Sequence, residues 1–136
     1  MPDARLHLTL HFIGSFPHDG IEALADRLAA VAPRRMMLRA DRPEVWRGGL
    51  AVLRIAPEAG VRGLHEDLGA VLSELAVPLD TRPFTPHVTL ARKAAGARPP
   101  DSAPELDWSA DGFALVDSIT GANAAYRVVR SFPTER

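Results

Sequence analysis

Apolar and polar residues alternate along residues 5–13, RLHLTLHFI. One side of an extended chain here would carry the apolar side chains Leu6, Leu8, Leu10 and Phe12. The other side would carry His7, Thr9 and His11. This period of two predicts a strand over 5–13 with one face in the core. A slip of one residue would bury the polar side, so the core fixes the register.

Two later segments place their apolar residues at helical spacing instead. The first, residues 21–32, follows a predicted loop at 14–20 and ends before Pro33. The second, residues 61–75, carries a single apolar stripe: Val61, Leu64, Leu68, Val71, Leu72 and Leu75. Both patterns predict helices with one face against a core.

The remaining apolar runs predict strands. Residues 36–40 and 50–56 flank a turn-rich segment at 41–49, and 82–92 is entered through two prolines. Residues 94–105 are loop-like in composition, and 112–119 and 126–132 would form a hairpin across 120–125. This order of strands and helices predicts the α+β class, with a mainly antiparallel sheet and outer helices.

Composition narrows the possibilities further. The chain has 136 residues, 46% of them hydrophobic, which suits one domain over 1–136. Its net charge of −1 creates no general field for nucleic acid. Cysteine is absent, which excludes disulfides and thiolate chemistry. No apolar run approaches the roughly 18 residues of a membrane span, and the N-terminal residues lack signal-peptide features. We therefore expect a cytoplasmic enzyme or binding protein without membrane contact.

A four-residue pattern occurs twice, as HLTL at 7–10 and HVTL at 87–90. On a strand, residues i and i+2 share a face, so each copy pairs a histidine with a threonine opposite apolar neighbours. Two imidazoles with pKa values near neutrality can serve as one base and one acid. Hydrolysis of a phosphodiester needs that pair, and threonine hydroxyls can stabilise the developing charge. This chemistry requires no metal and no cofactor.

Each histidine also has a purely structural interpretation. A single H-x-T on a strand is weak evidence for catalysis, whereas two copies in matching contexts favour it. His7 and His11 would lie about 13 Å apart on a strand, too far to share a metal ion easily. For His11 a surface role is favoured, for His65 a solvated or capping role, and His18 lies in a loop without informative neighbours.

The segments RLHLTLHFIG (5–14) and RPFTPHVTLAR (82–92) resemble the motifs of the 2H phosphoesterase superfamily. The branch they resemble most is that of the RNA 2′,3′-cyclic phosphodiesterases, also called 2′-5′ RNA ligases or LigT-like proteins. The resemblance extends to the helix around LHEDL and to GANAAYRVVRSFP near the C-terminus, so it covers nearly the whole chain.

This resemblance implies two pseudo-symmetric lobes, each supplying one motif strand to a central cleft. It implies metal-independent hydrolysis of RNA 2′,3′-cyclic phosphate ends to 2′-phosphomonoesters. His7 would be the general acid and His87 the general base, with Thr9 and Thr89 holding the phosphate. Arg92 matches an arginine that the family places near the phosphate. Strand parity puts it on the face opposite His87, so a bulge or the end of the strand near Ala91 would have to turn it in.

Several alternatives stay open at this point. Relative to the family the chain is expected to be short at its N-terminus by a strand and a helix. The position of His11 is often lysine in the family. The substrate could instead be a small cyclic nucleotide or an ADP-ribose cyclic phosphate, or the protein could be an inactive RNA-binding remnant. Trp46 and Phe84 could stack on a base, but packing is the favoured role for both. We expect a monomer.

Overall fold

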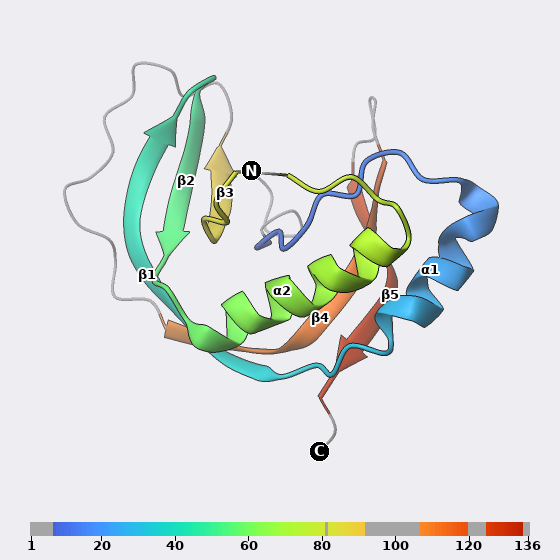
Figure 1. The fold of residues 1–136 in the computed structure, drawn as a ribbon. Coiled ribbons are helices and arrows are strands. Elements are labelled where there is room, and N and C mark those ends of the chain that lie inside the picture. The colour runs from blue at the N-terminus through green and yellow to red at the C-terminus, as the bar shows by residue number, and fades with distance from the viewer. Residues whose placement is uncertain (1–6, 81, 92–106, 120–124, 135–136) are drawn as a thin grey trace. The chain divides into compact units, whose positions relative to one another are not determined.

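A computed structural model describes residues 7–80, 82–91, 107–119 and 125–134. Along the chain the elements are a short 3₁₀ helix η2 (His18–Gly20), α1 (Ile21–Leu28), β1 (Arg35–Trp46), β2 (Leu50–Ile55), α2 (Ala59–Glu74), β3 (His87–Ala91), β4 (Asp107–Ile119) and β5 (Ala125–Pro133) (Figure 1). The strands form a five-stranded sheet with the order β3-β2-β1-β4-β5. The α+β class and the antiparallel pairing are confirmed, since β1/β2, β2/β3 and β4/β5 are all antiparallel.

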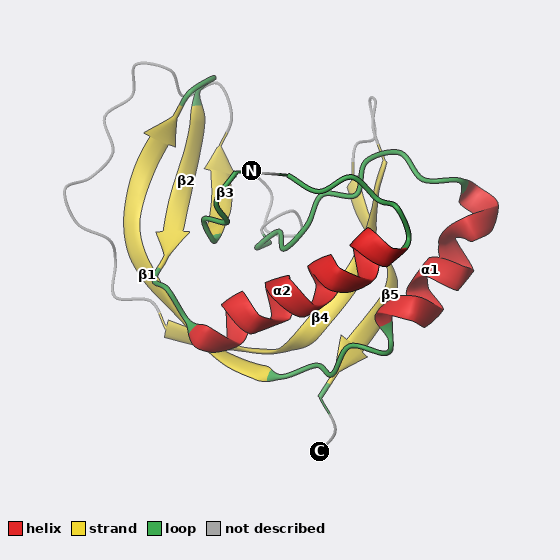
Figure 2. Ribbon diagram, viewed as in Figure 1, coloured by secondary structure: helices red, strands yellow, loops and turns green. Residues whose placement is uncertain are grey.

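The chain divides into two compact units. The first unit comprises Met1–Leu10, Met37–Pro57 and Pro83–Ser109. The second unit comprises His11–Met36, Glu58–Arg82 and Ala110–Arg136. Both copies of the H-x-T motif therefore belong to the first unit, and both α-helices belong to the second (Figure 2). The expectation that each of two pseudo-symmetric lobes supplies one motif strand stays a prediction.

The first unit is built on the hairpin of β1 and β2, with β3 on the other side of β2 (Figure 1). Gly48 and Gly49 both have positive φ, 86° and 80°, which the tight turn between the strands requires. Among the described residues of this unit, the buried apolar side chains are Leu38, Val52, Leu53 and Ile55. The pairing with β2 extends to the residue before β3, because the amide of Ile55 donates to the Pro86 carbonyl at 2.9 Å.

The second unit packs α1 and α2 together with the β4–β5 hairpin. Helix α2 buries the stripe expected from its spacing: Val61, Leu64, Leu68 and Leu72. Its first turn is capped by Glu58, whose carboxylate accepts from the amides of Gly60 and Val61 at 2.9 and 3.0 Å. Leu24, Leu28, Leu115 and Phe132 are also buried in this unit.

Two sequence predictions about strands are wrong. The segment 41–49 is not a long turn: β1 continues to Trp46, and only residues 47–49 turn. The pairing of β1 with β2 shifts register between Ala40 and Arg42. This shift accommodates Asp41 and Pro43, so residues that usually form turns lie within a strand. The strand predicted at 82–92 begins only at His87, after the two prolines.

The strand predicted at 5–13 is also largely absent from the described residues. Leu8 alone forms a bridge, to Val88, and residues 9–13 are irregular. Phe12, expected on the buried face, is 83% exposed. The physical reason lies in His11, whose ring is bound to helix α2 and takes the chain out of the extended path. An alternating apolar–polar sequence forms a regular strand only where it can hydrogen-bond to a neighbouring strand.

The other elements agree with the sequence predictions, with shifted ends. Helix α1 ends at Leu28, four residues before the expected end, and α2 begins two residues before the expected start. β4 and β5 contain the two strands of the predicted hairpin. The predicted loop at 94–105 lies outside the described residues, as do residues 120–124 of the predicted turn at 120–125; Ala125 begins β5. In the described part of the chain, no helix is both long enough and apolar enough to cross a membrane.

Candidate active site

The second H-x-T motif lies at the start of β3. Because β3 pairs with β2, Arg54 lies opposite His87 and Val52 opposite Thr89. Side chains of directly paired residues point to the same face of a sheet. His87 and Thr89 therefore share one face with Arg54, and Val88 faces the other side with Leu53. Both motif side chains are half-buried.

The first motif lies beside the second. The antiparallel bridge between Leu8 and Val88 joins the central apolar residues of the two motifs. In an antiparallel pair the neighbours run in opposite order, so His7 lies toward Thr89 and Thr9 toward His87. His7 and Thr9 are exposed. Two segments 80 positions apart in the sequence thus meet at their matching residues.

The imidazole of His87 is held in one tautomer. Its Nδ1 donates a hydrogen bond of 2.8 Å to the carbonyl oxygen of Thr85. A carbonyl oxygen only accepts, so Nδ1 carries the proton and Nε2 of the neutral ring has a lone pair. A backbone contact of this kind also fixes the orientation of the ring. His87 is therefore prepared to take a proton at Nε2.

Trp46, at the end of β1, packs against that imidazole. The two ring centroids are 4.4 Å apart and the planes are inclined by 59°. The indole Nε1 donates to Glu44 Oε1 at 2.8 Å, which fixes the indole in turn. This contact agrees with the packing role favoured from the sequence for Trp46. Phe84 is half-buried and lies before β3.

Charged side chains from β1 and β2 gather beside His87. Glu44 lies 3.1 Å from Arg42 Nε and 3.6 Å from Arg54 Nη1. The hydrogen bond from Trp46 lowers the pKa of the Glu44 carboxyl; burial opposes this, and the charges of Arg54 and Arg42 assist it. Glu44 is therefore ionised at neutral pH. Register pairs Arg42 with Arg54, so all of these side chains share the face of His87.

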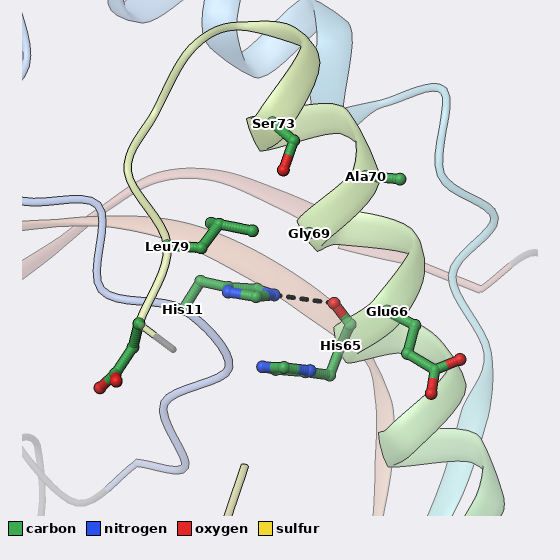
Figure 3. A pocket seen from close by; sticks show the side chains of 8 residues that line it. His11, His65, Glu66, Gly69, Ala70, Ser73 and Leu79 are labelled. Carbon is green, nitrogen blue, oxygen red and sulfur yellow. Dashed lines mark hydrogen bonds between the residues drawn. The ribbon is translucent and has the colours of Figure 1, made fainter. Parts of the chain in front are cut away.

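The second unit holds another pair of histidines, at a surface depression of about 310 Å³ (Figure 3). The rings of His11 and His65 are stacked, with centroids 4.0 Å apart and planes inclined by 12°. His11 Nε2 donates to the His65 backbone carbonyl at 2.7 Å (Figure 3). Gly69 makes room for this contact, since a Cβ there would lie 3.3 Å from His11 Cε1. His65, predicted to be solvated or capping, is instead part of a packed pair.

Desolvation is the main cause that lowers the pKa of His65. The neighbouring His11 lowers it further, and Glu66 opposes both effects. Among the described residues, the lining of this depression includes no threonine and no arginine. The depression is a contact between a loop and helix α2, whereas the first unit brings His87, Thr89 and Arg54 to one face of its sheet.

One predicted site residue is not described by the structure, and two residues beside His87 were not predicted. Arg92 lies outside the described residues. Among the described residues, no group of three His, Cys, Asp or Glu side chains could hold a metal ion. Sequence reasoning missed Glu44 and Arg54. A signal for Arg54 was present, because it is a charged residue inside the apolar run LAVLRIA with the same parity as Val52.

Comparison with known proteins identifies the family of this chain. The family model described as "2′-5′ RNA ligase superfamily" matches residues 1–121. The chain belongs to this superfamily. One superfamily relative, the RNA 2′,3′-cyclic phosphodiesterase of Thermus thermophilus, is 36% identical over 97% of this chain and 73% of its own length.

Two solved structures show the same superfamily fold. TT0787 of Thermus thermophilus has a TM-score of 0.72 at 34% identity, over 98% of this chain and 80% of that one. LigT of E. coli in its apo form has a TM-score of 0.80 at 23% identity, over 96% of this chain and 77% of that one. The resemblance to LigT-like 2H phosphoesterases expected from the two motifs is therefore confirmed at the level of family and fold.

Proposed function

We propose that this protein hydrolyses 2′,3′-cyclic phosphate ends of RNA to 2′-phosphomonoesters. The observation that carries the proposal is the Leu8–Val88 bridge, which puts the two H-x-T motifs side by side in one unit. The relative from Thermus thermophilus named RNA 2′,3′-cyclic phosphodiesterase supports it, at 36% identity over most of the chain.

The proposed reaction has one acid and one base. His87 Nε2 takes a proton from water, and the water oxygen attacks phosphorus. The bond from phosphorus to the ribose O3′ breaks, and His7 donates a proton to that leaving oxygen. The 2′-phosphate and a free 3′-hydroxyl result. The hydrogen bond from His87 Nδ1 to Thr85 supports the assignment of His87 as the base, because it leaves Nε2 unprotonated in the neutral ring.

The remaining site residues stabilise charge on the phosphate in this proposal. Thr9 and Thr89 donate hydroxyl protons to the non-bridging oxygens. Arg92 retains the phosphate-binding role that the family resemblance implies. The partners are RNA ends or cyclic nucleotides, the reaction needs no metal, and the site of action is the cytoplasm.

The test uses an oligoribonucleotide with a 2′,3′-cyclic phosphate end, in the presence of EDTA. We expect a 2′-phosphomonoester as the product, identified by its resistance to a 3′-specific phosphatase. Loss of turnover with EDTA, restored by a divalent ion, would show that the metal-free mechanism is wrong. Binding of the oligonucleotide without any turnover would favour the alternative of an RNA-binding protein. A matched assay with adenosine 2′,3′-cyclic phosphate and ADP-ribose cyclic phosphate separates RNA from smaller substrates.

A further inference from the structure

Arg54 occupies a special position in the first unit. It lies on β2, between Arg42 of β1 and His87 of β3, and is paired in register with both. Its side chain therefore extends from the centre of the sheet on the face that carries His87 and Thr89. Neighbouring strands are about 4.8 Å apart, so a guanidinium starting there can reach a group bound at His87.

The contacts of Arg54 leave hydrogen-bonding capacity unused. Its Nε is buried and has no hydrogen-bond partner among the described residues. Its Nη1 lies 3.6 Å from Glu44 Oε1, a long contact whose hydrogen bond makes only the smallest contribution to lowering the pKa of Glu44. The side chain is 32% exposed, so solvent and ligands can reach part of it. A buried donor without a partner is unfavourable, and an acceptor supplied by a ligand would relieve that cost.

Glu44 does not neutralise the cluster. Its carboxylate accepts from Trp46 at 2.8 Å and lies closer to Arg42 than to Arg54. Two guanidinium groups and one carboxylate leave a formal charge of +1 beside His87. A phosphodiester carries one negative charge, so the cluster and the substrate are complementary in sign.

We propose that Arg54 binds the phosphate group of the substrate, with Glu44 holding its guanidinium loosely until the substrate arrives. The inference rests on the proposed function, because it places the phosphate at His87. A guanidinium presents two parallel N–H groups to a phosphate, which suits binding of two oxygens at once. Arg54 shares the face of His87, because the two residues are paired in register.

The first experiment measures binding of inorganic phosphate by calorimetry, and KM and kcat for adenosine 2′,3′-cyclic phosphate. In Arg54→Gln we expect phosphate affinity to fall roughly 10- to 100-fold, as for loss of a charge-assisted hydrogen bond. KM should rise by a similar factor. Arg54→Lys keeps the positive charge but loses the two parallel N–H groups, so its phosphate affinity should lie between those of the parent and Arg54→Gln. This variant tests the proposal if Arg54→Gln folds poorly.

Matched variants give the controls. Arg42→Gln removes the other arginine of Glu44, one strand further from His87, and should cost clearly less phosphate affinity than Arg54→Gln. Glu44→Gln removes the competing carboxylate, so phosphate should bind more tightly than to the parent. A purely structural role for the cluster would make both Glu44→Gln and Arg54→Gln weaken binding.

The outcomes separate this inference from the proposed function. Turnover of the cyclic phosphate with unchanged phosphate affinity in Arg54→Gln and Arg54→Lys overturns the inference and leaves the function standing. An equal loss in Arg42→Gln also overturns it. Arg54-dependent phosphate binding in a protein without turnover supports the inference and counts against the function. Failure of the parent protein to bind phosphate overturns the inference.

Discussion

Two pairs of histidines occur in this protein, and they differ in what surrounds the rings. His7 and His87 belong to motifs that meet across the Leu8–Val88 bridge, beside threonines and an arginine. His11 and His65 stack on each other at a helix surface, 4.0 Å apart. Residue type is the same in both pairs. We propose proton transfer for the first pair, whereas the second pair joins a loop to helix α2.

The ring nitrogens make the difference concrete. His87 donates through Nδ1 to Thr85 and keeps Nε2 for a proton. His11 uses Nε2 for the His65 carbonyl, which ties its ring to the backbone of α2. Burial and the neighbouring His11 lower the pKa of His65, which favours the neutral form of that ring. Mutations of the four histidines should therefore have clearly different effects.

The largest expected effect is on turnover of the cyclic phosphate by His7→Ala and His87→Ala. A positioned general acid or base contributes roughly 10²–10⁴-fold, so each variant should lose most of its kcat. The double variant should be scarcely worse than either single one, because the two groups act as a unit. Steady-state kinetics on folded protein measure this. A variant that keeps parental kcat would remove that histidine from the mechanism.

The next effect concerns the hydroxyl groups of Thr9 and Thr89. Loss of one donor to a developing oxyanion costs up to roughly 10²–10³-fold, and less where water substitutes. Thr9→Ala and Thr89→Ala should therefore retain measurable turnover where the histidine variants do not. Thr9→Ser and Thr89→Ser keep the hydroxyl and serve as controls. If the serine variants lost as much as the alanine variants, the hydroxyls would have no direct role.

The sequence predicted the first pair of histidines better than the second for a physical reason. Strand parity and core burial determine which face His87 and Thr89 occupy, and both can be predicted from the neighbouring residues in the sequence. Contacts between distant segments cannot be predicted in this way. The stacking of His11 on His65 joins residues 54 positions apart, and it ended a strand that the local pattern favoured. Arg54 likewise comes to lie beside His87 only through the pairing of β2 with β3.

A smaller effect is expected for His11→Ala. The variant loses the hydrogen bond to the His65 carbonyl, which should lower the free energy of unfolding by about 1 kcal/mol. Turnover should stay within a few-fold of the parent, because the ring is not part of the motif pair. Denaturant unfolding and kinetics on the same samples measure both quantities. A loss of kcat equal to that of His7→Ala, in folded protein, would mean that the catalytic histidine was assigned to the wrong position.

The smallest effect is the pH dependence of stability that His65 contributes. Burial and His11 lower its pKa in the folded state, so the unfolded chain binds the proton more readily. The contribution of His65 to stability is then complete above its unfolded pKa of about 6.5. It is lost as the pH falls from there toward the lowered folded value, since the unfolded state gains protons first.

His65→Gln replaces the titrating imidazole with a side chain that does not titrate. The variant should therefore show a smaller decline of the unfolding free energy between neutral and mildly acidic pH. His18→Gln, which changes a histidine exposed in the 3₁₀ helix η2, is the control and should leave the decline unchanged. An equal slope in the parent and in His65→Gln would show that the stacked pair does not resist protonation.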